Sequence, residues 1–165
     1  MSDVYVECLI KAKGKGLFRF LKVLLIMLTV VFALLSLMGV VFMFILAIAA
    51  GVGIYFVNLQ CNVEYEYMYM DRELTIDKIM AKTKRKRVGV YSVDRMEIFA
   101  PVKSYHLDNF KNRSVTEKDF SIGEELKPDR RYVFYYEGGQ RILVSPSEEL
   151  VKAMKMIAPR KIFND

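Results

Sequence analysis

Side chains that could support catalysis are few and scattered in this 165-residue chain. His106 is the sole histidine, and no cysteine, second histidine or carboxylate pair stands at a useful spacing beside it. Cys8 and Cys61 lack the CxxC spacing of zinc and redox sites, so we expect reduced, structural thiols. No nucleophile–base pair and no glycine-rich phosphate loop is recognisable. We therefore predict a non-enzymatic protein with no cofactor and no metal.

Acidic residues are concentrated in one segment after the apolar part of the chain. Glu64 and Glu66 alternate there with the aromatic series Tyr65, Tyr67 and Tyr69, which is the period-two pattern of a half-buried strand. An exposed strand face accounts for these carboxylates without catalysis, and we extend that interpretation to the remaining acidic residues of the segment, Asp71, Glu73 and Asp77.

The strongest local charge is a basic run that is interrupted only by Thr83. Its members are Lys82, Lys84, Arg85, Lys86 and Arg87. From Glu64 onward the chain holds 20 Lys and Arg against 17 Asp and Glu, so the excess positive charge of this part comes from the run. We predict that it lies in a loop, 81–87, and contacts anionic lipid headgroups or a protein partner. A solvated hairpin tip that only sets membrane topology is the competing interpretation. A nucleic-acid patch is not expected beside a membrane segment.

The element that positions this run is an apolar stretch without parallel elsewhere in the chain. Between Lys22 and Glu64 lie 41 consecutive residues without Asp, Glu, Lys, Arg or His. One helix of that length would span roughly 60 Å, about twice the hydrocarbon thickness of a bilayer. Ser36 to Gly39 is the plausible break, which predicts a transmembrane helical hairpin at 17–59 with helices at about 17–37 and 40–59. A cleaved signal peptide would need a shorter apolar core, and one tilted span is the other alternative.

Positive residues flank both ends of the apolar stretch. The flank before it consists of Lys11, Lys13, Lys15, Arg19 and Lys22, and the basic run follows soon after it. The positive-inside rule then places both flanks in the cytoplasm. We predict a multi-pass protein of the cell membrane whose segment 1–16 and C-terminal part are both cytoplasmic.

The predicted hairpin contains no ionisable residue, so nothing in it indicates an ion path or a proton relay. Ala47, Ala50 and Gly51, with Ala49 and Gly53 offset, place small residues at helical spacing. Such a face permits close packing with the first helix or self-association with a second copy. We favour packing within the chain.

Residues 62–165 are predicted to form one cytoplasmic domain of strands and a final helix. Strands are expected at 63–70, 74–80, 87–91, 95–100, 132–136 and 141–144. A short strand is also expected near 115–122 in the poorly patterned segment 102–131, before the turn residues Gly123 and Pro128, and the pattern of 4–10 favours another. Two glycines, Gly138 and Gly139, predict a tight hairpin turn. The helix 146–158 is expected to begin with Ser145 as N-cap and Glu148 at N3, and to bury Leu150, Val151, Met154, Ile157 and Ala158.

Three short stretches carry a resemblance that covers nearly the whole chain. They are Asn62-Val63-Glu64-Tyr65-Glu66-Tyr67, Asp94-Arg95-Met96-Glu97-Ile98 and Ala158-Pro159-Arg160-Lys161. With the order of elements, they resemble a bacterial family of small two-helix membrane proteins from Gram-positive anaerobes with a pleckstrin-homology-like cytoplasmic domain. The resemblance implies an α+β membrane protein whose antiparallel β-sheet or barrel is capped by the C-terminal helix. It implies binding rather than chemistry, and specific phosphoinositide recognition does not transfer because the basic run follows the second strand of the domain.

Two functions follow as hypotheses. The first is a membrane-anchored binding module whose cytoplasmic domain docks on anionic lipid headgroups or on a protein partner through the basic run. The second is a structural or accessory subunit of a membrane protein complex, in which the small-residue helix face and the strand of Tyr65, Tyr67 and Tyr69 meet a partner membrane protein. Salt sensitivity separates the two, because headgroup attraction is screened within about 8 Å at physiological ionic strength.

Overall fold

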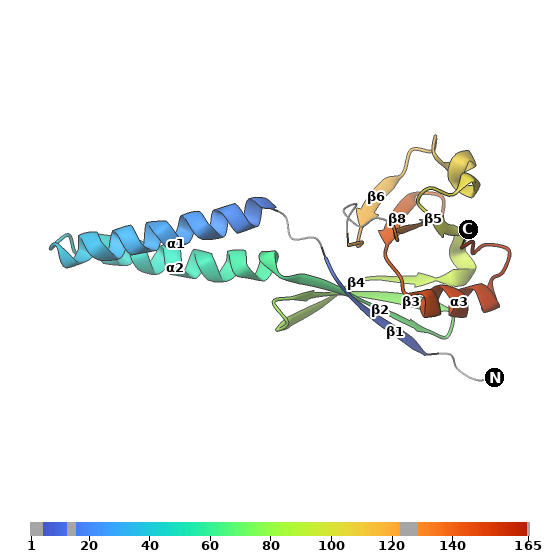
Figure 1. Cartoon of the computed structure of the whole chain (residues 1–165), viewed down its shortest axis with the longest axis horizontal. Coiled ribbons are helices and arrows are strands. Elements are labelled where there is room, and N and C mark those ends of the chain that lie inside the picture. Colours follow the sequence, from blue (N-terminus) through green and yellow to red (C-terminus); the bar gives the residue numbers. More distant parts are fainter. Residues whose placement is uncertain (1–4, 13–15, 123–128, 165) are drawn as a thin grey trace. The chain divides into compact units, whose positions relative to one another are not determined.

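The computed structural model describes residues 5–12, 16–122 and 129–164, and the chain divides into two compact units (Figure 1). One unit combines residues 14–63 with 80–84 and contains both long helices. The other holds the strands and the C-terminal helix. Lys13 and Lys15 of the predicted basic flank, and the predicted turn residues Gly123 and Pro128, lie outside the described residues.

The first unit is an antiparallel pair of apolar helices, α1 (Gly16–Leu37) and α2 (Phe42–Cys61). Their mean hydropathies of 2.6 and 2.2 and their lengths are sufficient for each to cross a membrane. The chain reverses between them at Gly39, whose φ of 96° favours glycine and whose N–H donates to the Ser36 carbonyl at 3.2 Å. The break therefore follows Leu37, close to the position that the sequence predicts.

The two helices pack through small residues of α2. Ala50 is buried, and a Cβ added to Gly53 would lie 3.5 Å from Leu25 Cδ1 on α1. A Cβ at Gly51 would meet nothing within 4 Å, so Gly53 makes the close approach and Gly51 does not. Lys22 Nζ also donates to Asn58 Oδ1 at 2.9 Å, which joins the beginning of α1 to the end of α2.

The first sheet has four strands in the order β1-β2-β3-β4: β1 (Val6–Lys11), β2 (Val63–Met70), β3 (Glu73–Met80) and β4 (Lys84–Ser92). The N-terminal strand β1 pairs antiparallel with β2, with Val6 opposite Tyr69 and Lys11 opposite Glu64. The chain thus supplies a sheet edge from residues that precede the helices. The β2–β3 and β3–β4 turns use non-glycine residues at positive φ, Asp71 and Arg72 in one and Ala81 and Lys82 in the other.

The second sheet has the order β5-β7-β8-β6: β5 (Met96–Pro101), β6 (Thr116–Asp119), β7 (Tyr132–Tyr136) and β8 (Gln140–Val144). The expected antiparallel pairing holds for β5–β7 and β7–β8, whereas β6 runs parallel to β8 and makes this sheet mixed. Both segments in which the sequence suggests a further strand supply one: β1 overlaps 4–10 and β6 lies within 115–122.

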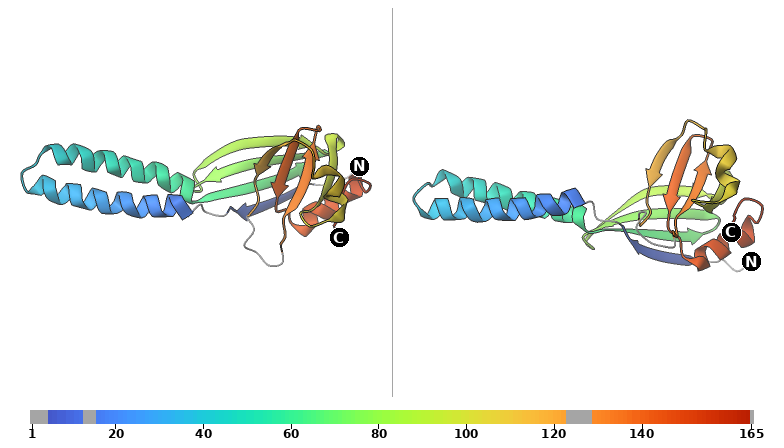
Figure 2. Two further views of the ribbon diagram at one scale, coloured as in Figure 1. Left: turned by 90° about the horizontal axis from the view of Figure 1, so that it is seen from above. Right: turned by 45° about the horizontal axis from the view of Figure 1, so that its top comes forward.

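The main core lies between the two sheets, whose strands cross one another (Figure 2). Phe134 is fully buried there, with its ring 5.1 Å from that of Tyr91 and 5.9 Å from that of Phe99. A Cβ at Gly89 would lie 2.4 Å from Tyr91 Cε2, so the absence of a side chain there makes room for this ring. Alternation along β7 sends Val133 and Tyr135 to a second, smaller apolar cluster on the outer face of the second sheet.

The helix α3 (Glu148–Ile157) packs on the main core through Leu150, Val151, Ala153 and Met154. Its predicted cap is wrong by two residues: Ser147 Oγ accepts from Leu150 N at 3.3 Å, whereas Ser145 Oγ accepts from Ile122 N. Ser145 is needed elsewhere because its own N–H donates to the Tyr67 hydroxyl. Ile157 is 38% exposed and does not join the buried face.

Candidate functional site

The predicted basic loop is wrong in its extent. Ala81, Lys82 and Thr83 form the turn, in which Thr83 N donates to Met80 O at 3.1 Å. Lys84 to Arg87 instead begin β4. The charged side chains therefore alternate along an extended strand, and an edge strand rich in lysine is a common way of preventing unwanted strand pairing.

The turn is attached to the end of α2. Ala81 N donates to Asn62 O at 2.7 Å, directly after the last residue of the helix. Lys84 Nζ lies 5.9 Å from the centroid of the Tyr55 ring, within reach of a weak cation–π contact. Lys82 and Lys84 thus belong to the end of the helix pair at which Lys22 also lies.

Arg85 has partners on the adjacent strand β3 and on β2, the next strand of the sheet. It pairs with Glu66 on β2 through Nη2 and with Asp77 on β3, where Nε lies 2.9 Å from Oδ2. Arg87 Nε approaches Asp77 Oδ1 at 3.5 Å. The two arginines therefore hold two carboxylates of the first sheet's outer face.

The two carboxylates correct the prediction of an exposed acidic face. Glu66 is 7% exposed and Asp77 is 4% exposed. Glu66 Oε2 and Asp77 Oδ1 accept no hydrogen bond from the residues that the structure describes, so the guanidinium groups are their compensation. A buried carboxylate without a cationic partner is strongly destabilising. Arg85 and Arg87 consequently serve the fold as well as the surface.

The five basic residues fall into two sets. The arginines are bound to buried carboxylates, although their side chains remain 51% and 65% exposed. The other set, Lys82, Lys84 and Lys86, is exposed, and none of its members forms a salt bridge within ranges 5–12, 16–122 and 129–164. These three lysines, named below the free lysines, are the groups that an external anion would meet first.

The isolated residues considered for catalysis have structural neighbours. The His106 ring stacks on Phe163 with centroids 3.8 Å apart. Cys8 lies on β1 and Cys61 ends α2, and both are free thiols. Among the described residues no group of three or more His, Cys, Asp or Glu could hold a metal ion.

The aromatic strand β2 lies mainly inside the domain, which corrects its predicted role as a partner surface. Tyr67 is 1% exposed and Tyr69 is fully buried. The Tyr67 hydroxyl donates to Phe120 O at 2.7 Å and accepts from Ser145 N at 3.1 Å, so it ties the first sheet to the second. Burial raises the pKa of Tyr67 well above its ordinary value, and the hydroxyl stays protonated.

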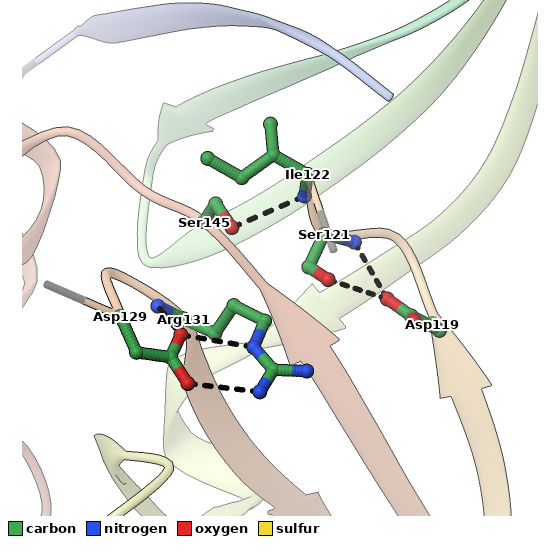
Figure 3. Close-up of polar contacts among 6 residues, drawn as sticks. All are labelled: Asp119, Ser121, Ile122, Asp129, Arg131 and Ser145. Carbon is green, nitrogen blue, oxygen red and sulfur yellow. Dashed lines mark hydrogen bonds and ion pairs between the residues drawn. The ribbon is translucent and has the colours of Figure 1, made fainter. Parts of the chain in front are cut away.

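A group of polar contacts that sequence patterns did not reveal holds the chain on both sides of residues 123–128 (Figure 3). Asp119 Oδ1 accepts from Ser121 N at 2.9 Å and from Ser121 Oγ at 2.7 Å. Asp129 accepts two hydrogen bonds from the Arg131 guanidinium, at 2.9 and 2.8 Å, with both side chains largely buried. Hydrogen bonding from Arg131 lowers the pKa of the Asp129 carboxyl below its ordinary value. The pair is two residues apart, a spacing that carries no specific signal.

The elements define an α+β protein with two long apolar helices. Its two sheets enclose one core, on which a C-terminal helix packs. A family model for a bacterial pleckstrin-homology-like domain (DUF6106) matches residues 2–164, and the chain belongs to this family. The predicted α+β class and the pleckstrin-homology-like domain are thereby confirmed. Searches of curated proteins and of solved structures returned no match.

Proposed function

We propose that this protein is a non-enzymatic, membrane-anchored binding module that contacts anionic lipid headgroups through the free lysines. In this proposal α1 and α2 span the cell membrane as a hairpin, and both flanks lie on the cytoplasmic side, as the positive-inside rule favours. Pleckstrin-homology-like domains are generally binding modules, which supports the non-enzymatic part.

The observation that carries the proposal is the attachment of the basic turn to the end of α2. Through the Ala81–Asn62 hydrogen bond and the Lys84–Tyr55 contact, the first two free lysines are held beside the point at which an apolar helix ends. Tyrosine at such a position is typical of the membrane–water interface. A lysine near an anionic surface contributes about 1 kcal/mol.

The arginines play a second part in the proposal. Arg85 and Arg87 are half exposed but already neutralise Glu66 and Asp77. The lipid contact therefore depends mainly on Lys82, Lys84 and Lys86, and the arginines add less than their charge alone would imply.

The test uses the full chain reconstituted in nanodiscs of phosphatidylcholine with or without phosphatidylglycerol. Lysine acylation is followed residue by residue by mass spectrometry at low and high salt. We expect the free lysines to react several-fold more slowly in anionic discs and to recover in high salt, since exposed charges are screened. Lys103 and Lys152, which are exposed residues outside the basic run, serve as internal references.

A matched pair of variants completes the test. K82N/K84Q/K86Q removes the free lysines, with Asn at 82 because the φ of 57° there suits Asn. K103Q/K152Q/R160Q removes the same charge from other exposed positions. Retained phosphatidylglycerol should fall in the first variant only. Equal reactivity in both disc types, or equal lipid loss in both variants, would contradict the proposal and leave the basic run as a topology signal.

A further inference from the structure

The outer face of the second sheet is covered by a short helical turn rather than by a full layer. The 3₁₀ segment η2 (Tyr105–Phe110) places Leu107, which is 3% exposed, on Val133, Tyr135 and their apolar neighbours. The Phe110 ring lies 5.0 Å from that of Tyr135. One turn of this kind covers only part of a four-stranded sheet.

A pocket of about 280 Å³ remains beside η2, partly open to solvent. It is lined by the apolar residues Val102, Leu107 and Val115, by Tyr135, and by the charged residues Lys111, Glu117 and Arg141. Its volume is close to the lower end of the roughly 300–1,000 Å³ of small-molecule sites. All of these residues belong to the unit that holds the strands and the C-terminal helix.

Among the described residues, the two cations of the pocket pair with carboxylates at the surface. Arg141 pairs through Nη1 with Glu117, which lies beside it in the β6–β8 register and has a side chain 52% exposed. Lys111 Nζ pairs with Asp108 Oδ1 at 2.6 Å, and that side chain is 60% exposed. Exposed ion pairs of this kind contribute little to stability and are readily exchanged.

The Arg141 side chain is less exposed than that of its partner Glu117 and keeps unused hydrogen-bond donors. It is only 29% exposed, and no hydrogen bond from its Nε or Nη2 is found among the described residues. A guanidinium has a planar fork of donors that matches a carboxylate in two parallel hydrogen bonds. Once Glu117 is displaced, the guanidinium can therefore hold, through two parallel hydrogen bonds, a carboxylate that enters the pocket.

We propose that this pocket binds a small organic carboxylate with a compact apolar body. The apolar body would pack against Val102, Leu107 and Val115, and the carboxylate would replace Glu117 on Arg141, one negative charge for another. A dianionic phosphate fits less well because the two cations already face two carboxylates. The site is separate from the free lysines and does not depend on the proposed lipid contact.

The experiment titrates the full chain in nanodiscs with 3-phenylpropanoate, using methyl NMR of labelled Val and Leu. Shifts of Val102, Leu107 and Val115 are expected in the millimolar range. The neutral analogue 3-phenylpropanamide should bind at least tenfold more weakly. Protein-free nanodiscs measure how much of each probe enters the lipid.

Two substitutions locate the contact. R141Q should weaken binding of the carboxylate about tenfold while leaving that of the amide unchanged. R95Q is its control. Arg95 Nη1 lies 2.9 Å from Glu137 Oε1 in a comparable surface pair, and neither residue lines the pocket. V115F should reduce binding of both probes by filling the cavity, with the methyl spectrum reporting that the fold persists.

Three results would overturn the proposal: no shift at the pocket methyl groups, equal affinity for the carboxylate and the amide, or equal loss of affinity in R141Q and R95Q. Each is read from residues outside the free lysines, so failure here is distinguishable from failure of the lipid contact.

Discussion

The two sheets share one core but treat their outer faces in opposite ways. The first sheet carries Glu66 and Asp77 on its outer face and neutralises them with arginines of β4. The second carries an apolar cluster that includes Tyr135 and is partly covered by η2. A charge-neutralised face can remain in contact with water. An apolar face needs a cover, and an incomplete cover leaves a pocket.

The largest expected effect is on the covered face. Leu107→Ala removes a side chain that is 3% exposed beside an existing cavity, and such a change typically costs about 2–5 kcal/mol. Leu9→Ala makes the same change on the outer face of the first sheet, where Leu9 is 57% exposed, and should stay within about 0.5 kcal/mol. The free energy of unfolding of the β domain is measured by urea titration of the full chain. Similar losses in both variants would contradict the contrast between the faces.

The next effect tests the neutralised face. Arg85→Ala leaves Glu66 without its ion pair and Asp77 with Arg87 alone. Because Arg85 is half exposed, we expect a loss of about 1–3 kcal/mol, below the range for a wholly buried pair. The same urea titration provides the measurement.

Two further variants identify the cause of that loss. Adding Glu66→Gln and Asp77→Asn to Arg85→Ala should restore much of the stability, because neutral amides do not need a cation. Arg113→Ala is the control, since its pair with Glu97 is largely at the surface and is expected to matter by at most about 1 kcal/mol. If the amides bring no recovery, charge is not what the arginine supplies.

The connection between the sheets can be tested by a pair of tyrosine variants. Tyr67→Phe leaves the Ser145 N–H and the Phe120 carbonyl without their buried partner, and we expect a loss of about 1–3 kcal/mol. Tyr91→Phe also removes a buried hydroxyl, but that hydroxyl has no partner among the described residues. This second variant should be neutral or slightly stabilising. Equal losses would show that the Tyr67 hydrogen bonds do not join the sheets energetically.

The smallest expected effect is present near neutrality and disappears in acidic solution. Because the pKa of folded Asp129 is lowered, its contribution is complete above its unfolded pKa of about 4 and is lost as the pH falls through the folded value. Asp129→Asn should therefore cost about 1 kcal/mol near neutrality, and the difference from wild type should shrink below about pH 4. Urea titrations of both proteins across this pH range provide the measurement. A pH-independent difference for Asp129→Asn would contradict the assignment.

Local patterns predicted much of this fold. The alternation from Val63 to Tyr69 identified β2, and the paired glycines after Tyr136 marked the β7–β8 turn, although positive φ falls on Glu137 and Gly138 and not on Gly139. The class of the chain followed from such elements. The N-cap was misplaced because the spacing of Ser145 and Glu148 matches a capping box, whereas in the structure Ser145 Oγ accepts from Ile122 N and Ser147 caps the helix.

The candidate sites were harder to predict from the sequence, because they also depend on contacts between distant segments. The basic run could be found by counting charges, but the partners of Arg85 lie on two other strands, 19 residues away at Glu66 and 8 at Asp77. The pocket beside η2 joins residues from 102 to 141, most of them in the segment with the weakest pattern. Pairing across a sheet depends on register, which no single segment contains.

The sequence alone determined the two apolar helices, the strands with clear alternation and the position of the positive charge, because each depends on the composition or period of a continuous segment. The tertiary structure decided that β1, which precedes both helices in the sequence, pairs with β2, which follows them. It also decided that β6 runs parallel to β8 and that two of the five basic residues neutralise buried carboxylates. These outcomes depend on which distant segments become neighbours, and that choice is made by the burial of a shared core.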